Sequence, residues 1–446
     1  MEVNNDKNLI LIGTENHVIM INCDLKNRDF SKRKNIHETQ ESINQIKLMH
    51  KPNSTKEILI VVDNSGEIVV ITLDLIDIKK KKSKLDIFEV VKAQKYNSKI
   101  IFHDNSPWSV DCQYPYIIIG SNNRTVFVFN YEEKENEKEN NNEQSNNSII
   151  YKGNSHNVPY VTISDNGAFI GNNSIDTTFK IFDFQTGELI CSAKNPKSEW
   201  GWGIKFIPKD LFRIINFEFE DENSRKNDNV INSALNEVGM TNYNIDNPSP
   251  YEENDENKIS YDDLNDYEKY LKLNLIDKYY ILTTSNKCAG LYEFDFKLQN
   301  NTNKKEVKVI PLGKIELLRI YLRDLFMDQI EIDMRTRFLL NGIKQCSRYE
   351  FVFYSKNMNL FLLGSKSGDL HVFEMNIYKD KKNKLICVED EPNVLISFGE
   401  KVAGMKFLDN NENRRYIIDI FVLTLSGMFY YYKISPDINY WESNYE

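Results

Sequence analysis

The pattern of apolar and polar residues repeats along the chain as short strands joined by polar turns. The clearest copy is the stretch His156–Asp183, with the sequence HNVPYVTISDNGAFIGNNSIDTTFKIFD. It predicts an alternating strand, a turn, a second strand, a polar loop with the turn Asp176–Thr178, and a third strand, Phe179–Asp183. Period-two alternation bounded by Asn, Asp and Gly is typical of short antiparallel strands.

Seven segments along the chain end in the same kind of strand, and each follows an apolar run such as LILIG, ILIVV or YIIIG. They are His17–Asp24, Gly66–Asp74, Arg124–Asn130, Phe179–Phe184, Gly290–Phe296, Gly368–Met375 and Gly427–Lys433. Recurrent strand pairs of this kind suit propeller blades, whose inner strands are buried between neighbouring blades. We therefore predict an all-β fold: one closed, seven-bladed β-propeller over residues 1–446. The N-terminal strands are expected to complete the final blade.

Long polar segments make the spacing of the blades irregular. Residues 132–148 begin with EEKENEKENNNEQSNN and are predicted to be a disordered loop. Residues 219–278 contain EDENSRKNDN and NPSPYEENDEN, and are predicted to be an acidic insertion within the fifth blade. The run KKKKSK at residues 79–84 has two open interpretations, a solvated loop or a nuclear-import signal.

The net charge is −10 and the pI is near 5.4, which argues against direct binding to nucleic acid. An acidic surface favours basic protein partners instead. The six cysteines show no C-x-x-C spacing and fit a reducing compartment. With neither a secretory signal nor an apolar run of about 20 residues, we expect no membrane association and an intracellular protein, nuclear or cytoplasmic.

The usual catalytic and metal-binding motifs, such as HExxH, GxSxG and GxxxxGK[ST], do not occur in the sequence. We therefore predict no catalytic, cofactor-binding or metal-binding residues, and no cofactor. An enzyme with a pocket at the central channel remains an alternative, and it would need titratable residues that converge there. His156 and Asp176 are interpreted as a hydrogen-bonded pair that locks a blade, because buried polar groups need partners.

The tryptophans offer a candidate partner surface at Trp108, Trp200 and Trp202. Trp200 and Trp202 are two residues apart, so on a strand they would project from one face. A rim of aromatic side chains on one propeller face could bind a partner. The alternative interpretation is that each tryptophan packs under the neighbouring blade.

The segment Asp176–Asp183 (DTTFKIFD) resembles the closing strand of a WD repeat, with Phe182 where tryptophan is usual. The segments DNSPWSVD, IIIGSNNRTVFVF, HNVPYVTIS, WGWGIKFIPKDLF and RYEFVFYSKNMNLFLLGSKSGDLHVFEM follow one another in this order. Their order looks like the fungal WD-repeat family described as transcriptional regulators of ribonucleotide reductase genes, over most of residues 100–375. The resemblance implies a WD-type propeller that acts in the nucleus, as a substrate receptor beside a cullin-type ubiquitin ligase. It transfers no functional residues.

These observations together predict a non-enzymatic protein-interaction scaffold with a regulatory role. Its expected partners are other proteins, including components of cullin-type ubiquitin ligases. A propeller subunit of a trafficking or coat complex is the second alternative. Such subunits usually carry a helical solenoid after the propeller, and this chain ends soon after Lys433. The oligomeric state stays open.

Overall fold

The computed structural model describes thirteen stretches of the chain. They are residues 1–6, 8–24, 29–76, 87–96, 106–131, 148–216, 279–286, 288–299, 304–316, 348–379, 385–387, 393–412 and 415–435. The predicted loop at 132–148, apart from Ser148, and the predicted insertion at 219–278 lie outside these residues, as does the KKKKSK run.

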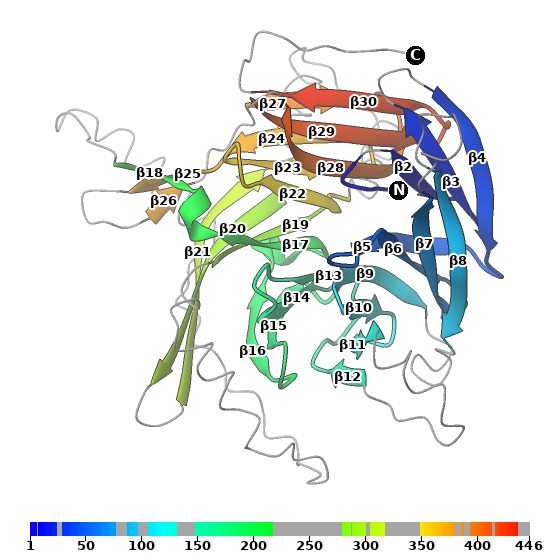
Figure 1. Ribbon diagram of the computed structural model, residues 1–446. Coiled ribbons are helices and arrows are strands. Elements are labelled where there is room, and N and C mark those ends of the chain that lie inside the picture. Colours follow the sequence, from blue (N-terminus) through cyan, green and yellow to red (C-terminus); the bar gives the residue numbers. More distant parts are fainter. Residues whose placement is uncertain are drawn as a thin grey trace, which may run out of the picture.

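The described strands form seven antiparallel sheets arranged in a ring (Figure 1). The first three blades are β1 (Glu2–Val3), β2 (Leu9–Gly13), β3 (His17–Asp24) and β4 (Asp29–Glu38); β5 (Ile43–His50), β6 (Lys56–Asp63), β7 (Ile68–Ile76) and β8 (Ile87–Tyr96); and β9 (Pro107–Gln113), β10 (Tyr116–Ser121), β11 (Val126–Asn130) and β12 (Ser148–Tyr151). The fourth blade is β13 (Tyr160–Ile163), β14 (Phe169–Asn173), β15 (Thr178–Asp183) and β16 (Leu189–Lys194).

The fifth blade is β17 (Gly201–Pro208), β19 (Tyr279–Ser285), β20 (Cys288–Gln299) and β21 (Lys304–Glu316). The sixth is β22 (Phe351–Ser355), β23 (Leu360–Gly364), β24 (Asp369–Glu374) and β27 (Val394–Ser397), and the seventh is β28 (Val402–Glu412), β29 (Arg415–Thr424) and β30 (Phe429–Ile434). Two short 3-10 helices, η3 (Pro196–Ser198) and η4 (Lys209–Leu211), flank β17. The seven blades confirm the predicted all-β propeller, and each of the seven predicted closing strands is the third strand of a blade.

Seven hydrophobic clusters fill the interfaces between neighbouring blades. Strand alternation produces them, because successive side chains of a strand point to opposite faces. In β10, Ile117 and Ile119 pack against the second blade, whereas Ile118 packs against the fourth. The clusters include one between the first and seventh blades, formed by Val3, Ile10, Cys23, Leu408 and Phe421. A cluster at every one of the seven interfaces means that the ring is closed.

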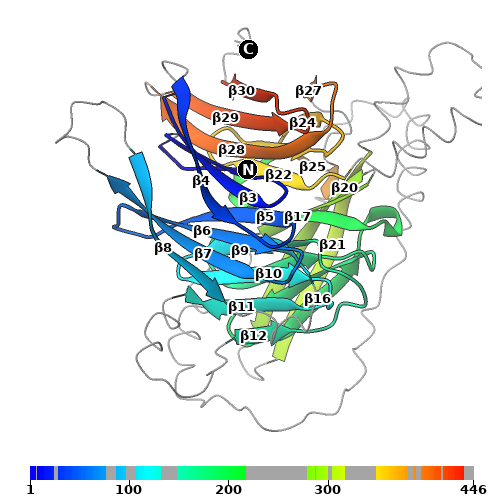
Figure 2. The ribbon, with the colours of Figure 1, turned by 90° about the vertical axis from the view of Figure 1, so that its right-hand side faces the viewer.

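The ring closes by side-chain packing, which corrects the expectation that N-terminal strands complete the final blade. The strands β1–β4 pair with one another as a blade of their own, and the described seventh blade has three strands. Because residues 1–38 already supply all four strands of the first blade, none remains to join β30. The two blades lie side by side (Figures 1 and 2), joined by the apolar cluster and by an ion pair between Lys406 and Glu2, 2.6 Å apart.

A small accessory sheet outside the ring joins the fifth and sixth blades (Figure 1). It consists of β18 (Arg213–Asn216), which follows β17, and of β25 (Asn376–Lys379) and β26 (Leu385–Cys387), which follow β24. β18 and β25 pair in parallel, and the Arg213 amide donates a hydrogen bond to the Met375 carbonyl at 2.8 Å. The accessory sheet therefore holds β18, the first part of the connection between β17 and β19, against the segment that follows β24 of the sixth blade.

The closed ring generates a first prediction, at the seam between the first and seventh blades. Phe421 is fully buried there and stacks on Tyr431, with ring centroids 5.0 Å apart. Phe421→Ala should lower the free energy of unfolding by about 3–5 kcal/mol, because it leaves a cavity at the closing interface. Tyr416→Ala, a control on the same strand at a side chain 45% exposed, should change it by less than about 0.5 kcal/mol in urea denaturation. Equal effects of the two substitutions would contradict closure through this seam.

Candidate functional site

The first strands of the blades lie nearest the middle of the ring (Figure 1), so their side chains line the axis. We name the two ends of the propeller by residues. The Trp200 face is the end where the first strands begin and the turns between second and third strands lie. The Asp165 face is the opposite end, where the first strands finish. Both terms rest on the antiparallel order of strands within each blade.

Asp111, on the first strand of the third blade, is the hub of a buried charge network at the axis. Its Oδ1 lies 2.9 Å from Lys47 Nζ of the second blade. Its Oδ2 accepts hydrogen bonds from Thr162 Oγ1 and the Ile163 amide of the fourth blade, each 3.1 Å long. Lys205 Nζ of the fifth blade lies 4.0 Å from the same oxygen. One carboxylate therefore connects four successive blades.

The pKa values in this network follow from burial and pairing. Burial alone would raise the pKa of Asp111, but Lys47, Lys205 and the hydrogen bonds outweigh it and hold that pKa well below its usual range. Burial would lower the pKa of Lys47, yet Asp111 raises it well above the ordinary value. Lys205 differs, because burial lowers its pKa more than Asp111 raises it.

Two further ion pairs lie near the axis towards the Trp200 face. Lys406 of the seventh blade pairs with Glu2 of the first at 2.6 Å, and Lys366 pairs with Glu350 at 2.9 Å. At the Asp165 face, Asp165 Oδ2 accepts a hydrogen bond from the Tyr354 hydroxyl at 2.6 Å and lies 2.7 Å from Lys356 Nζ. These ion pairs, one within the sixth blade and two between different blades, neutralise most of these charges.

Titratable groups do converge at the channel, so it is not lined by backbone and apolar side chains alone. Their states do not favour nucleophilic or acid–base chemistry. Burial raises the pKa of the Cys112 thiol to about 12 and also raises that of the Tyr160 phenol, so both stay protonated near neutral pH. Asp111 is held in ion pairs rather than poised near neutral pH. The arrangement is suited to holding blades together.

The network predicts a large effect of a conservative substitution. Asp111→Asn should lower the free energy of unfolding by about 3–5 kcal/mol at neutral pH, because it leaves the largely buried Lys47 ammonium without its carboxylate and removes the weaker compensation of Lys205. The folded-state pKa lies below the unfolded value of about 3.9, so this contribution is complete above about pH 4 and declines on further acidification. Glu293→Gln removes a more exposed pair with Lys209 and serves as the control, expected to change stability by less than about 1 kcal/mol. A deficit in Asp111→Asn no larger than the control's would contradict the hub role.

His371 is a second buried titratable group, in the core between the fifth and sixth blades. Its Nε2 lies 3.2 Å from the Tyr349 hydroxyl, and its Nδ1 is buried without a hydrogen-bond partner among the described residues. Burial lowers its pKa from 6.5 to about 4. The ring is therefore neutral in the folded protein at physiological pH.

This histidine should make the protein sensitive to mild acid. Between pH 6.5 and 4 the unfolded chain binds more protons than the folded one, so the stabilisation is complete above 6.5 and declines as the pH falls towards 4. From about pH 7 to about pH 5 the loss should be about 2 kcal/mol. His371→Gln, which cannot titrate, should show a smaller loss in the same urea titrations. An identical pH dependence in both proteins would refute the assignment.

The structure gives His156 and Asp176 different hydrogen-bond partners. Asp176 Oδ2 accepts a hydrogen bond from the Ser155 amide at 2.9 Å and lies 3.2 Å from Lys180 Nζ in an ion pair that is only 6% exposed on either side. The exposed His156 ring accepts a bond from the Asn157 amide through Nδ1. Asp176 therefore connects the turn after β14 to the segment before β13. It does so through Ser155, the residue before His156, which was the predicted partner.

A buried amide pair beside this turn was not anticipated from the sequence. Asn172 Nδ2, on β14, donates to Asn154 Oδ1 at 2.9 Å, and both side chains are nearly or fully buried. Asn154 stands two residues before His156, in the segment that leads into β13. The sequence signal for this pair is weak, because this chain is rich in asparagine and most of its asparagines occur in polar loops.

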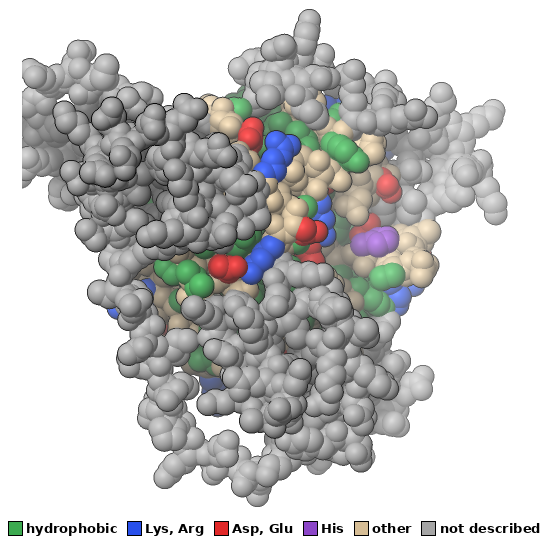
Figure 3. Space-filling view, turned by 90° about the vertical axis from the view of Figure 1, so that its left-hand side faces the viewer, with side chains coloured by type: hydrophobic (Ala, Val, Ile, Leu, Met, Phe, Trp, Pro, Cys, Tyr) green, Lys and Arg blue, Asp and Glu red, His purple; other side chains and the backbone are tan. Residues whose placement is uncertain are grey.

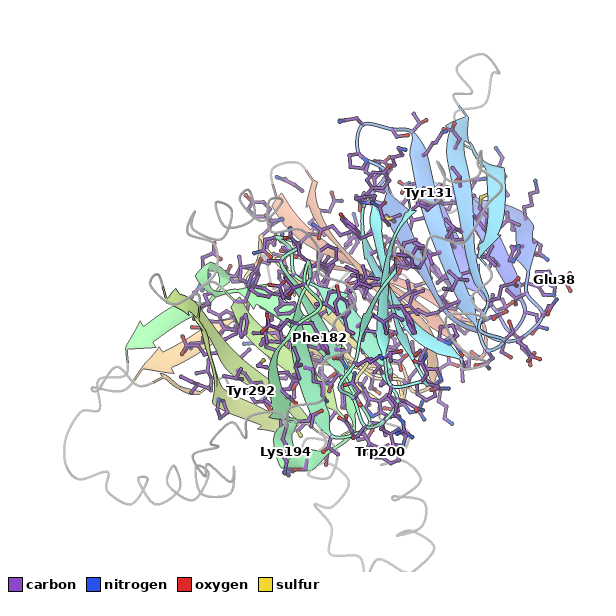
Figure 4. The ribbon with its side chains drawn as sticks, turned by 90° about the horizontal axis from the view of Figure 1, so that it is seen from below. Glu38, Tyr131, Phe182, Lys194, Trp200 and Tyr292 are labelled. Atoms are coloured by element: carbon purple, nitrogen blue, oxygen red, sulfur yellow. The ribbon has the colours of Figure 1, made fainter. Side chains whose placement is uncertain are left out.

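The three candidate tryptophans are placed differently. Trp202 is 3% exposed, and its Nε1 donates a hydrogen bond to Asn286 Oδ1, which fits the packing interpretation. Trp200 is 51% exposed and touches Trp202 edge to face, with ring centroids 6.5 Å apart. Figure 4 shows Trp200 at the periphery, whereas Phe182 lies among packed side chains. Trp108 is half-buried on β9, two blades away.

A strained loop presents Trp200 to solvent. Lys197 and Ser198 are consecutive non-glycine residues with φ of 56° and 51°, a left-handed conformation that side chains disfavour. The loop is held by Asn195, whose Nδ2 donates to Asn173 Oδ1 at 2.7 Å, and by Glu199, whose Oε2 accepts from Ser285 Oγ at 2.9 Å. Because both ends of the loop are anchored to buried groups, the exposed indole stands on a fixed support.

Other exposed side chains lie on the Trp200 face, from the fifth blade to the seventh. The Arg348 guanidinium lies 4.3 Å from the centroid of the Trp202 ring and is itself exposed. Leu425 is 68% exposed and Met428 is 42% exposed, both in the turn between β29 and β30. We call Trp200, Arg348, Leu425 and Met428 the Trp200 arc. Elsewhere, as in the view of Figure 3, described acidic and basic side chains lie next to one another.

Two structural findings bear on other classes of function. Among the described residues, no three His, Cys, Asp or Glu side chains gather in a way that could hold a metal ion. In the same part of the chain, no helix has the length and apolar character needed to span a bilayer.

Comparison with known proteins agrees with this architecture. A scan against models of protein families finds no match. The chain is 29% identical over 139 residues to a WD repeat-containing protein of Schizosaccharomyces pombe, which is 30% of this chain and 28% of that protein. The chain thus matches little more than a quarter of this relative's length. That relative and the seven blades together support a WD-repeat propeller.

Two solved structures match most of the chain at low sequence identity. Saccharomyces cerevisiae Sqt1 has a TM-score of 0.48 and 9% identity, over 99% of this chain and 82% of that one. A chain of the mitotic checkpoint complex has a TM-score of 0.45 and 8% identity, over 98% of this chain and 84% of that one.

Proposed function

We propose that the protein is a non-enzymatic scaffold that binds other proteins through the Trp200 arc. The observation that carries this proposal is Trp200 itself, a large aromatic side chain that is 51% exposed on an anchored, strained loop. Burying an indole releases a large apolar area from water, and tryptophan and arginine are the residues most enriched at binding hot spots. Their proximity here, with Arg348 stacked beside Trp202, favours a protein-binding role.

The rigidity of the propeller supports the same role. Trp202 fixes the base of the arc by burial and by its bond to Asn286, and β17 is packed between the fourth and sixth blades. A side chain that is already ordered loses little conformational entropy on binding, so more of its contact energy appears as affinity. Leu425 and Met428 extend the apolar part of the arc to the seventh blade.

We further propose a nuclear regulatory role, in transcriptional control of ribonucleotide reductase genes, with cullin-type ubiquitin ligase components among the partners. The support for this finer proposal is the ordered resemblance of residues 100–375 to that fungal family. The competing hypothesis is an enzyme with its site in the central channel, because titratable residues lie there. The protonated Cys112 and the ion-paired Asp111 count against it.

The scaffold proposal predicts that Trp200→Ala folds normally but loses partners. In affinity purification followed by mass spectrometry, recovery of specific partners should fall at least about tenfold, as expected for a hot-spot residue. Thermal unfolding should match wild type, because the side chain is half exposed. Tyr416→Ala, which removes a comparably exposed aromatic residue from the Asp165 face, should retain all partners.

Recovery of cullin-type ligase components by wild type would support the finer proposal, whereas vesicle-coat subunits would favour the trafficking alternative. Full partner recovery by Trp200→Ala would contradict binding through the arc.

A further inference from the structure

Among the described lysines near the axis of the propeller, Lys205 differs from the others because no carboxylate is closely paired with it. Asp111, Glu2, Glu350 and Asp165 each have a lysine of their own, at 2.6–2.9 Å: Lys47, Lys406, Lys366 and Lys356 respectively. Lys205 is the fifth lysine. The carboxylate nearest to it among the described residues is Asp111, which it approaches only to 4.0 Å.

Asp111 has little capacity left for a second cation. Its Oδ1 is paired with Lys47, and its Oδ2 already accepts hydrogen bonds from Thr162 Oγ1 and the Ile163 amide. The close contact of Lys205 Nζ is with the neutral Thr162 hydroxyl, at 3.1 Å. An ammonium group away from bulk water without a full counter-charge is unfavourable, so this position favours an added anion.

The side chain of Lys205 is partly open to the channel. It is 22% exposed and that of Lys47 is 24% exposed, so part of each side chain contacts solvent. Lys205 belongs to β17, which begins one residue after Trp200, and so it lies inside the channel whose rim carries the Trp200 arc. A group that enters the channel would meet Lys205 of the fifth blade and Lys47 of the second, the latter already paired with Asp111.

We propose that Lys205 is an anion-binding site in the central channel, which takes the carboxylate or phosphate oxygens of a small molecule or of an acidic protein side chain. Lys205 supplies the incompletely compensated charge, and Lys47 stands nearby as a further donor. A bound oxyanion would keep the Lys205 ammonium protonated, which burial otherwise opposes. The site is independent of the Trp200 arc, and either can exist without the other.

The test measures binding of inorganic phosphate and of a phosphoserine-containing peptide to the full chain by isothermal titration calorimetry. Wild type should bind at least one of the two probes. Lys205→Met should weaken that binding at least about tenfold, as expected for loss of a charge-assisted contact. The control is Lys209→Met, because Lys209 is equally exposed at 22% but has its own carboxylate, Glu293, at 2.8 Å. It should bind as wild type does.

A second variant and the choice of probe sharpen the result. Lys205→Gln keeps a hydrogen-bonding side chain beside Thr162, and is used if Lys205→Met does not fold; it should lose binding in the same way. Phosphate binding identifies a small-molecule site, and binding of the peptide alone identifies a protein ligand. Trp200→Ala should leave phosphate binding unchanged. Absence of binding of both probes to wild type, or unchanged binding in the neutral Lys205 variants, would overturn the proposal.

Discussion

The burial of both faces of the middle strands is the constraint on which the rest of the structure depends. Strands such as β10 place alternate isoleucines into two different inter-blade clusters, so no blade can bury its apolar surface with a single neighbour. A linear stack would leave an apolar face exposed at each end. Closing the ring removes both faces at once, and the cluster between the first and seventh blades is where this happens.

Closure gathers the first strands at the axis, where the apolar pattern gives way to charge. Lys47, Asp111 and Lys205 come from different blades and are separated by long stretches of sequence, yet they meet within one network. Such charges are tolerated there because most of them are ion-paired, within a blade or between blades, and because several of the side chains are partly exposed to solvent. The same geometry leaves recognition to the rim, where side chains such as Trp200 are held on short loops.

The sequence predicted the propeller through its second and third strands, and for a physical reason. Those strands are buried on both sides, so they are almost continuously apolar. Polar turns bound them, and the change from apolar to polar residues can be recognised in the sequence. The first strands were harder to assign, because their apolar runs are interrupted by a single charged residue, as in IKL, VDC and IKF around Lys47, Asp111 and Lys205. A single charged residue within the apolar run of a first strand is therefore the sequence pattern that indicates a channel residue.

Other features could not be read from local patterns. The accessory sheet pairs β18 with β25, which follow strands of two different blades, and parallel pairing leaves no turn signal between them. The different roles of Trp200 and Trp202 depend on where β17 begins, since one residue stands before the strand and the other within it. The same limit applies to Asp176, whose partner is Ser155 rather than its neighbour His156.

Hydrogen exchange on the native protein, followed by mass spectrometry, tests the closed ring most directly. If closure between the first and seventh blades holds the ring together, amides of β2, β3 and β29 should be as protected as those of β14 and β15, and all should lose protection in one cooperative step on addition of denaturant. Terminal blades that exchange early, while the fourth blade stays protected, would show an open array of blades and contradict this account.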